Sequence, residues 1–592
     1  MTPMRRGTIG LCAMLAVACG DDGGPTSDTE GASTSSGSTG ASGSTSVATN
    51  TSETGEPATS STSGVDSTGV ADSGDSGSSS GGPAVSIDDP LRLVFVADDA
   101  VGDIDELWYL DEADYAAGAI RVNQELIGPR LISPTVRVTD DGGWLLYRTV
   151  RLAPGAEHEL WVADMSGGAP AAGVRVDDTP ELVHEYDFVG AQPRVVWIGP
   201  SGVYAVDLSG GTPSAPQALT PAPTGGGAYV LYELGQSDGR IYYTADPDGT
   251  GVENLYAVPA DGSAAPTLLS DLSVPMTSVD GNTLFPDPGG AWVVYAADRD
   301  VPEPEMFWVD LAAPGVATKI NDPVTTESIR TERLSPSGAF LAYFAGELGT
   351  PDLGDVFVVP IDAAGPGAPI AVHTAMTGLP QAGRIAFSPD ESWLQYTADE
   401  GGNLQSWVIS LDGGVPGTPM LVSGTVPADG DDVVTHLFSP DSNSVVYIAD
   451  SDGPVDLYWV DLSSGAPGPI QRLVDPAPTG SGLTGDVAFS PDGTQLLFTG
   501  FVTSIETRDV YTIDLAAGPP WTTEKVNPTL LPNEEVGVTP RFAGEGTHVL
   551  YVGPGPDRGD RQLFDHPPGG EGFDEVVPIS GSGFVKSFRA LP

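Results

Sequence analysis

The sequence predicts an all-β fold: a β-propeller of four-stranded blades, arranged as one ten-bladed ring that a C-terminal strand closes, with two smaller propellers as the alternative. A repeat of about 50 residues runs from about residue 91 to the C-terminus. The chain also has 77 glycines and 54 prolines, and turn signals recur about every 8–12 residues. Repeats of about 40–50 residues with strand-forming sequence are typical of propeller blades. Each repeat is marked by an aromatic residue within a short apolar run: Phe95, Tyr147, Trp197, Tyr243, Tyr295, Tyr343, Tyr396, Tyr447, Phe498 and Tyr551.

The ninth repeat shows the four strands most clearly. A strand over 486–489 leads into Ser490-Pro-Asp-Gly493, and strands over 495–500 and 508–515 follow, with a short one near Lys525. In the turn, Pro fixes φ, Asp caps backbone N–H groups and Gly takes a positive φ. Four strands in one repeat of this length are expected to form one blade.

The same turn recurs at Phe387-Ser-Pro-Asp390 and Phe438-Ser-Pro-Asp441, and a third strand of the type Phe307-Trp-Val-Asp310 recurs in most repeats. These motifs resemble the PD40 (WD40-like) repeat of TolB-type β-propellers over about residues 91–592. The resemblance implies a propeller that binds proteins or peptides around its ring. It carries no catalytic residue over to this chain.

The two ends of the repeat region predict how the ring closes. The first repeat starts at its second strand, Leu91–Ala97, and lacks an inner strand. After the last outer strand the chain adds Gly583–Ala590, which fits the vacant place. We expect this strand to bury Phe584 and Phe588 and to leave no open sheet edge.

The N-terminus predicts secretion and lipidation. Arg5 and Arg6 precede an apolar run too short to cross a bilayer, which ends in Leu15-Ala-Val-Ala-Cys19. This segment resembles a bacterial lipoprotein lipobox, which implies a signal peptide over 1–18 and a lipid on Cys19. An ordinary secretory signal cleaved after Ala18 is the alternative.

The segment 19–86 is predicted to be a disordered tether, and 87–592 to be the propeller. Residues 20–86 contain no Lys, Arg or aromatic residue and are rich in Gly, Ser and Thr. A coil of that length reaches roughly 45 Å. The domain would therefore stand clear of the membrane that anchors it.

The net charge of the chain restricts the classes of ligand that it is expected to bind. The chain has 81 acidic and 24 basic residues, a formal net charge of −57. Such a charge repels phosphate backbones and anionic membrane surfaces, so we expect no nucleic-acid ligand and no membrane contact beyond the lipid.

No catalytic, cofactor-binding or metal site is predicted. Gly235-Gln-Ser237-Asp-Gly239 matches the nucleophile-elbow pattern but lies between two predicted strands, where a hairpin turn explains it. Acidic loops at Asp246–Gly251 and Asp450–Asp456 lack the full spacing of a calcium loop. No two of the six histidines are close in sequence, so no zinc site is predicted. They are His158, His184, His373, His436, His548 and His566.

These observations predict a monomeric lipoprotein of the bacterial cell envelope, anchored to the outer membrane and either periplasmic or surface-exposed. It would be non-catalytic, without cofactors, and would bind a protein or peptide, with a glycan as the other ligand class. The alternatives are a glycan-active hydrolase or lyase with a site in the central channel, and a calcium-dependent adhesion module. Asp, Glu, Arg and Tyr facing the channel from several blades would favour the enzyme, and small or apolar residues would favour binding.

Overall fold

The computed structural model shows an all-β protein, and its described residues all belong to one compact unit, Gly74–Pro592. The predicted signal peptide, Cys19 and the tether lie outside the described residues. Described are residues 91–591 except 100–103, 112–118, 124–129, 152–157, 178–182, 184, 191–192, 236–238, 271–278, 298–304, 322–326, 348–353, 374–384, 400–403, 412–413, 425–432, 451–454, 475–481, 533, 537, 545, 555–560, 567–573 and 576–583.

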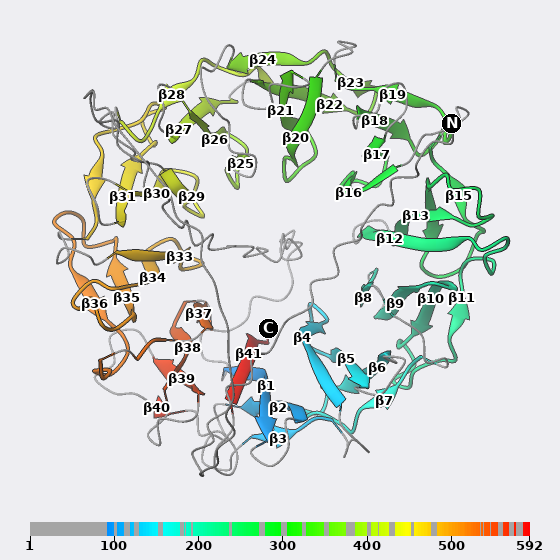
Figure 1. Ribbon diagram of the computed structural model, residues 1–592, viewed down its shortest axis with the longest axis horizontal. Coiled ribbons are helices and arrows are strands. Elements are labelled where there is room, and N and C mark those ends of the chain that lie inside the picture. Colours follow the sequence, from blue (N-terminus) through cyan, green and yellow to red (C-terminus); the bar gives the residue numbers. More distant parts are fainter. Residues whose placement is uncertain are drawn as a thin grey trace, which may run out of the picture. The chain divides into compact units, whose positions relative to one another are not determined.

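Ten four-stranded blades form a closed ring, as the sequence predicts (Figure 1). Within each blade, neighbouring strands pair antiparallel from the inner to the outer edge. The innermost strands are β41 (Phe584–Ala590), β4 (Arg130–Val138), β8 (Glu185–Phe188), β12 (Ala228–Gly235), β16 (Val279–Pro286), β20 (Glu327–Leu334), β25 (Ile385–Phe387), β29 (Val433–Phe438), β33 (Leu483–Phe489) and β37 (Val538–Ala543).

The second and third strands carry most of each blade. The second strands are β1 (Arg92–Asp99), β5 (Trp144–Arg151), β9 (Arg194–Gly199), β13 (Arg240–Asp246), β17 (Trp292–Ala297), β21 (Phe340–Glu347), β26 (Trp393–Asp399), β30 (Ser444–Asp450), β34 (Gln495–Gly500) and β38 (His548–Pro554). The third strands are β2 (Ile104–Asp111), β6 (His158–Asp164), β10 (Gly202–Asp207), β14 (Asn254–Pro259), β18 (Glu305–Asp310), β22 (Gly354–Asp362), β27 (Leu404–Ser410), β31 (Val455–Asp461), β35 (Asp509–Asp514) and β39 (Arg561–His566).

The outer strands are short. They are β3 (Ile120–Arg121), β7 (Val174–Arg175), β11 (Gln217–Ala218), β15 (Thr267–Leu268), β19 (Ala317–Lys319), β24 (Ile370–His373), β28 (Met420–Leu421), β32 (Gln471–Arg472), β36 (Thr523–Lys525) and β40 (Asp574–Glu575). In the sixth blade a further pair of residues, β23 (Gly365–Pro366), folds back on the end of β22.

All ten aromatic markers of the repeat lie on second strands and are buried, and each stands directly opposite an aromatic residue of the third strand. In seven blades the two rings contact each other, for example Tyr447 and Tyr458 with centroids 5.1 Å apart. Cross-strand aromatic pairs stabilise a sheet and bury large areas. The repeated marker is therefore half of a pair that fixes the register of each blade.

The apolar core is divided among the ten contacts between neighbouring blades. Each of ten buried clusters combines side chains from two successive blades. One of them joins the last blade to the first, through Leu550 and Leu563 on one side and Leu93 and Phe95 on the other. A single ring of ten blades follows, and the two-propeller alternative is wrong.

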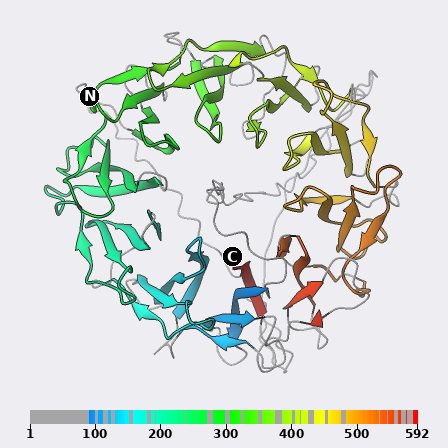
Figure 2. The same cartoon turned by 180° about the vertical axis from the view of Figure 1, so that it is seen from behind.

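The C-terminal strand supplies the inner strand of the first blade, as predicted. β41 pairs antiparallel with β1, with Leu93 opposite Ala590 and Phe95 opposite Phe588. The side chains that it buries differ from the prediction: Val585 is fully buried and Phe588 only half-buried, while that of Phe584 lies outside the description. The register of the pair shifts between Val96 and Ala97, and such a bulge changes the face to which the following side chains point. Figure 2 shows the same closure from the other face of the ring.

Candidate functional site

The innermost strands differ in charge from the rest of the protein. Figures 1 and 2 show these strands nearest the middle of the ring, and we call their residues the inner wall. Whereas the whole chain has 81 acidic and 24 basic residues, the inner wall has seven of each. They are Glu185, Asp187, Glu233, Asp280, Glu327, Glu332 and Asp486, against Arg130, Arg137, Arg330, Arg333, Arg541, Lys586 and Arg589.

The inner wall is also irregular in its backbone. In eight blades the pairing of the inner strand with the second strand shifts register. In β4 the shift falls between Ile132 and Val136, around Ser133 and Pro134, because a proline cannot donate to the ladder. Bulges redirect side chains and are common beside functional sites. The inner wall therefore presents charged groups from a backbone that departs from regular pairing.

One group of charges lies between the second and third blades, where inner-wall residues meet Arg148 of the second strand β5. Arg137 of β4 approaches Asp187 of β8, with 3.5 Å between Nε and Oδ2. Arg148 of β5 donates from Nη1 to the carbonyl oxygen of Val183 at 3.0 Å, and its guanidinium carbon lies 5.3 Å from the centre of the Tyr186 ring. Guanidinium groups on an aromatic face are stabilised by the ring quadrupole. Two arginines and two carboxylates thus meet at the junction of two blades.

This group shifts the proton affinity of a carboxyl. Burial raises the pKa of Glu185 above its ordinary value, although the charges of Arg137 and Arg148 oppose the rise, and Asp187 adds to it. Burial also raises the pKa of Tyr186, whose hydroxyl donates to the Thr135 carbonyl oxygen at 2.7 Å. Perturbed carboxyls beside specific charges are frequent at functional sites. Glu185 can exchange a proton at a higher pH than a solvated glutamate, and the arginines can hold an anionic group.

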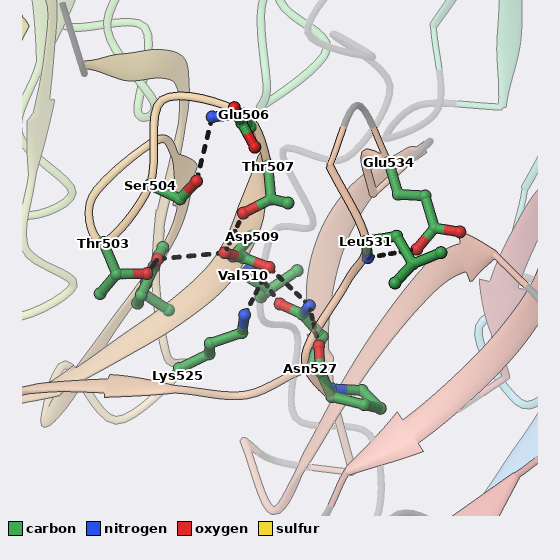
Figure 3. A network of polar contacts seen from close by, with 12 residues as sticks. Thr503, Ser504, Glu506, Thr507, Asp509, Val510, Lys525, Asn527, Leu531 and Glu534 are labelled. Carbon is green, nitrogen blue, oxygen red and sulfur yellow. Dashed lines mark hydrogen bonds and ion pairs between the residues drawn. The ribbon is translucent and has the colours of Figure 1, made fainter.

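A second polar network lies in the ninth blade and centres on Asp509, the fully buried first residue of β35 (Figure 3). Its Oδ1 contacts Lys525 Nζ at 2.7 Å and accepts from Asn527 Nδ2 at 2.8 Å. Its Oδ2 accepts from Thr507 Oγ1 at 3.1 Å and from Tyr511 Oη at 3.4 Å. Because both oxygens are satisfied, the buried charge is compensated rather than strained.

The ion pair in this network, between a third-strand acid and an outer-strand base, recurs around the ring. In five blades an acid lies two residues before the third-strand aromatic, and it pairs with a base that stands opposite that aromatic on the outer strand. The pairs are Glu106–Arg121, Glu159–Arg175, Glu305–Lys319, Asp456–Arg472 and Asp509–Lys525. The sequence analysis did not identify these pairs, although the acid-x-aromatic spacing is visible in the sequence. Five of the 24 basic residues therefore neutralise buried acids in this way.

A hydrogen-bond acceptor just after the outer strand recurs as well, in blades with and without this ion pair. In seven blades it accepts a hydrogen bond from a third-strand N–H, as Asn527 does from Val510 at 2.7 Å. The equivalent acceptors are Asn123, Asp177, Thr220, Ser270, Asn321 and Ser423.

The motifs weighed from the sequence fall mainly into structural roles. Gly235 pairs with Arg240 across the β12–β13 hairpin, as expected for a turn, while Gln236–Asp238 lie outside the description. Asp246 accepts from the backbone of Thr250 and Gly251 at 3.0 and 2.6 Å, which is turn capping. Asp456 pairs with Arg472, and Asp452 is not described. Within the described residues no three His, Cys, Asp or Glu side chains gather closely enough to hold a metal.

Three histidines have described contacts, and each belongs to a separate blade. His158 Nδ1 lies 3.0 Å from the Val183 carbonyl oxygen, and His373 Nδ1 lies 2.9 Å from the Tyr396 hydroxyl. His548 Nδ1 lies 2.9 Å from Asp565 Oδ1. His436 is half-buried in β29.

The described part of the chain contains no helix of the length and apolarity that a membrane crossing needs.

No protein-family model matches the chain. A curated relative, dipeptidyl aminopeptidase BIII of Pseudoxanthomonas mexicana, is 24% identical over 238 residues, which are 38% of this chain and 31% of the relative. The chain therefore matches about a third of the length of that relative. Among solved structures, puromycin hydrolase is 16% identical, with 71% of this chain and 58% of the hydrolase covered at a TM-score of 0.32. TolB from Acinetobacter baumannii is 14% identical, with 69% and 82% covered at a TM-score of 0.26.

The expectation that the protein is not an enzyme is contradicted by the curated relative, which is an aminopeptidase. That expectation rested on the lack of a recognisable catalytic motif in a repetitive sequence. A propeller fold is compatible with both binding and catalysis, so the fold alone could not support it. The inner wall bears on the same question, because Asp, Glu, Arg and Tyr from several blades lie on it.

Proposed function

We propose that this protein is a peptide-binding β-propeller of the bacterial cell envelope, and that the inner wall of the ring recognises the peptide. The balanced charge of the inner wall carries the proposal. A peptide offers an amine, a carboxylate and side chains of both signs, and a surface with equal numbers of acids and bases is complementary to such a ligand. The resemblance to TolB-type repeats and the similarity to an aminopeptidase both favour peptides as the ligand class.

Along the inner wall, the group at the second and third blades, which includes Arg148 of the neighbouring strand β5, is the strongest candidate subsite. Arg137 and Arg148 offer fork-shaped donors that suit a carboxylate. Glu185 and Asp187 lie beside them and discriminate against a second anion. A peptide segment with an acidic group would be held here in one orientation.

Binding to an immobilised peptide library, measured with the full chain in detergent, tests this function. Arg148→Gln combined with Glu185→Gln should weaken capture of the preferred peptides at least tenfold. Arg121→Gln removes a base of the same kind from an outer strand and should leave capture unchanged. Equal capture by all three proteins would place recognition elsewhere.

The location is part of the proposal. Cys19 would carry the lipid, and residues 19–86 would tether the propeller to the outer membrane, on its periplasmic or external side. Expression of Cys19→Ser followed by envelope fractionation tests the anchor. A variant that remains as membrane-bound as the parent would contradict it.

A second candidate function is peptide hydrolysis, favoured by the similarity to dipeptidyl aminopeptidase BIII and by the charged inner wall. Chromogenic dipeptidyl anilides are the direct test. Release of the chromophore by the purified chain, abolished by substitution of inner-wall residues, would support catalysis. Binding without turnover of any bound peptide would support recognition alone.

A further inference from the structure

Two large apolar side chains are exposed on neighbouring loops of the ninth blade. Ile505, between β34 and β35, is 57% exposed, and Leu531, between β36 and β37, is 48% exposed. Because the strands of a blade alternate in direction, the loop from the second to the third strand and the connection to the next blade emerge on the same face. We call the segments 501–508 and 528–536 the blade-9 loops.

Direct contacts join the blade-9 loops. Val536 N donates to the Arg508 carbonyl oxygen at 3.1 Å, and Arg508 Nη2 donates to the Val536 carbonyl oxygen at 2.6 Å. The two segments run parallel past each other at Arg508 and Glu535, which places Ile505 and Leu531 on the same side of that bridge. The carboxylate of Glu534 accepts from Leu531 N at 2.6 Å.

The Asp509 network fixes the base of these loops (Figure 3). Thr507, at the end of the first loop, donates to Asp509, and Asn527, at the start of the second, donates to the same carboxylate. The ordering entropy of both loops is therefore lost on folding rather than on binding. A surface held in this way binds a partner at a lower entropic cost.

Ile505 and Leu531 lie on loops that contact each other. Several other exposed apolar residues of the described part lie on outer strands, as Ile120 and Val174 do in separate blades. Single residues of this kind are normal on protein surfaces, whereas grouped ones mark interaction sites. Ile505 and Leu531 belong to one pair of loops that hydrogen bonds hold together.

The surrounding charge indicates the partner. The blade-9 loops contain three acids, Glu506, Glu534 and Glu535, and one base, Arg508, which pairs with Glu535 at 3.3 Å. Their excess of acid adds to the field of a chain with net charge −57. Positively charged partners are attracted to such a surface, and anionic membranes are repelled.

We propose that the blade-9 loops form a docking surface for a protein segment in which an apolar side chain is flanked by lysines or arginines. The apolar side chain packs on Ile505 and Leu531, and the bases lie against Glu506 and Glu534. This surface is separate from the inner wall, so it does not depend on the function proposed for that wall.

The test uses a fluorescein-labelled peptide of alternating leucine and lysine, with a leucine–glutamate peptide as the charge control. Fluorescence anisotropy with the full chain in detergent should show binding of the first peptide only, weakening as salt is raised. Ile505→Ser with Leu531→Ser should reduce the affinity at least tenfold. Val316→Ser with Val415→Ser removes two apolar side chains of other blades that are each 67% exposed, and should leave the affinity unchanged.

Two further measurements test the role of the acidic residues and whether a second copy of the chain occupies the surface. Glu506→Gln should weaken binding about twofold to fivefold, because it removes one of the exposed acids while keeping both apolar side chains. Failure of the lysine peptide to bind, or equal binding by the double serine variant, overturns the proposal. Self-association of the parent chain in sedimentation, lost in that variant, would identify a second copy as the occupant and would also overturn it.

Discussion

The first and ninth blades each bury an aspartate against a lysine, yet the two lysines come from very different places in the chain. In the ninth blade, Lys525 lies on the outer strand of the same repeat as Asp509. In the first blade, Lys586 of the C-terminal strand contacts Asp105, a residue 481 positions away. The same pair of residue types therefore fixes loops in one blade and joins the two ends of the ring in the other.

The difference lies in what must be ordered before each contact can form. The ninth blade assembles from one continuous stretch, and four donors gather on Asp509 within that stretch. The first blade needs the far end of the chain, and closing so long a loop costs entropy that grows with the logarithm of its length. We therefore expect the first blade to control the integrity of the ring, and the ninth blade to control the local order of its own loops.

The largest effect is expected on deleting residues 582–592, which removes β41 from the first blade. The blade would lose the pairing with β1 and the burial of Val585 and Leu591, each worth about 2 kcal/mol when fully buried. Against a typical stability of about 5–15 kcal/mol, the loss should lower the melting temperature by several degrees and expose an edge that aggregates.

Calorimetry and size-exclusion chromatography measure both effects. Removal of Pro592 alone is the control and should change neither. If the full truncation melted like the parent, closure by the C-terminal strand would contribute little to stability, and the comparison between the two blades would fail.

The next largest effect is expected for Asp509→Asn in the ninth blade. The change leaves Lys525 without its counter-ion and disturbs the donors Thr507, Tyr511 and Asn527. Breaking one partner of a buried pair costs about 3 kcal/mol or more. Limited proteolysis should cut the blade-9 loops earlier in the variant, while the closure of the first blade persists.

Glu305→Gln in the fifth blade is the matched comparison, because Glu305 pairs with Lys319 at the equivalent position. The fifth blade has no described counterpart of Thr507 or Tyr511 on its acid, so the loss should be about 1–2 kcal/mol. Equal losses at the two sites would mean that the additional donors in the ninth blade add no stability.

The sequence allowed much of this architecture to be predicted, because the ten markers recur at one place in every blade. Phe95 and Phe498 both lie on second strands opposite aromatic partners, and this regular period is a local property of the chain. The spare strand at Phe584–Ala590 was also recognisable, since the first repeat lacked one. Period and alternation are therefore sufficient to predict the ring.

The candidate sites could not be predicted in the same way. Asp509 and Glu185 are two acids among 81, and only the fold shows that one meets Lys525 and the other lies near Arg137 and Arg148. The charge balance of the inner wall also depends on knowing which strands are innermost. Non-catalytic function was inferred from the absence of a motif, and such an absence says little when residues from several blades can combine.

A smaller effect is expected for Lys586→Met in the first blade. The lysine side chain is 38% exposed, so solvent screens its contact with Asp105, and the free energy of unfolding should fall by about 1 kcal/mol. Lys525→Met in the ninth blade should cost more, because its partner Asp509 is fully buried and would lose its counter-ion. Chemical denaturation of the two variants ranks them, and a larger loss for Lys586→Met would reverse the roles assigned to the two blades.

The smallest effect concerns the turn that joins the inner strand of the ninth blade to its second strand. The first blade has no such turn, because its inner strand β41 and its second strand β1 are at opposite ends of the chain. Asp492 lies in the turn between β33 and β34, and its side chain contacts with Ser490 and the backbone N–H of Thr494 lower its pKa below the ordinary value of 3.8. A carboxyl whose pKa is lower in the folded state stabilises the protein above the unfolded pKa, and this contribution disappears as the pH falls through the folded value. Asp492→Asn should therefore cost about 0.5–1 kcal/mol at pH 7, the range of a single hydrogen bond, and less at pH 3. Denaturant unfolding of both proteins at the two pH values measures the gap, with exposed Glu524→Gln as the control. If the difference in free energy of unfolding between parent and variant were the same at both pH values, the charge of Asp492 would not stabilise the turn. The turn between β33 and β34 would then give the ninth blade no advantage over the first.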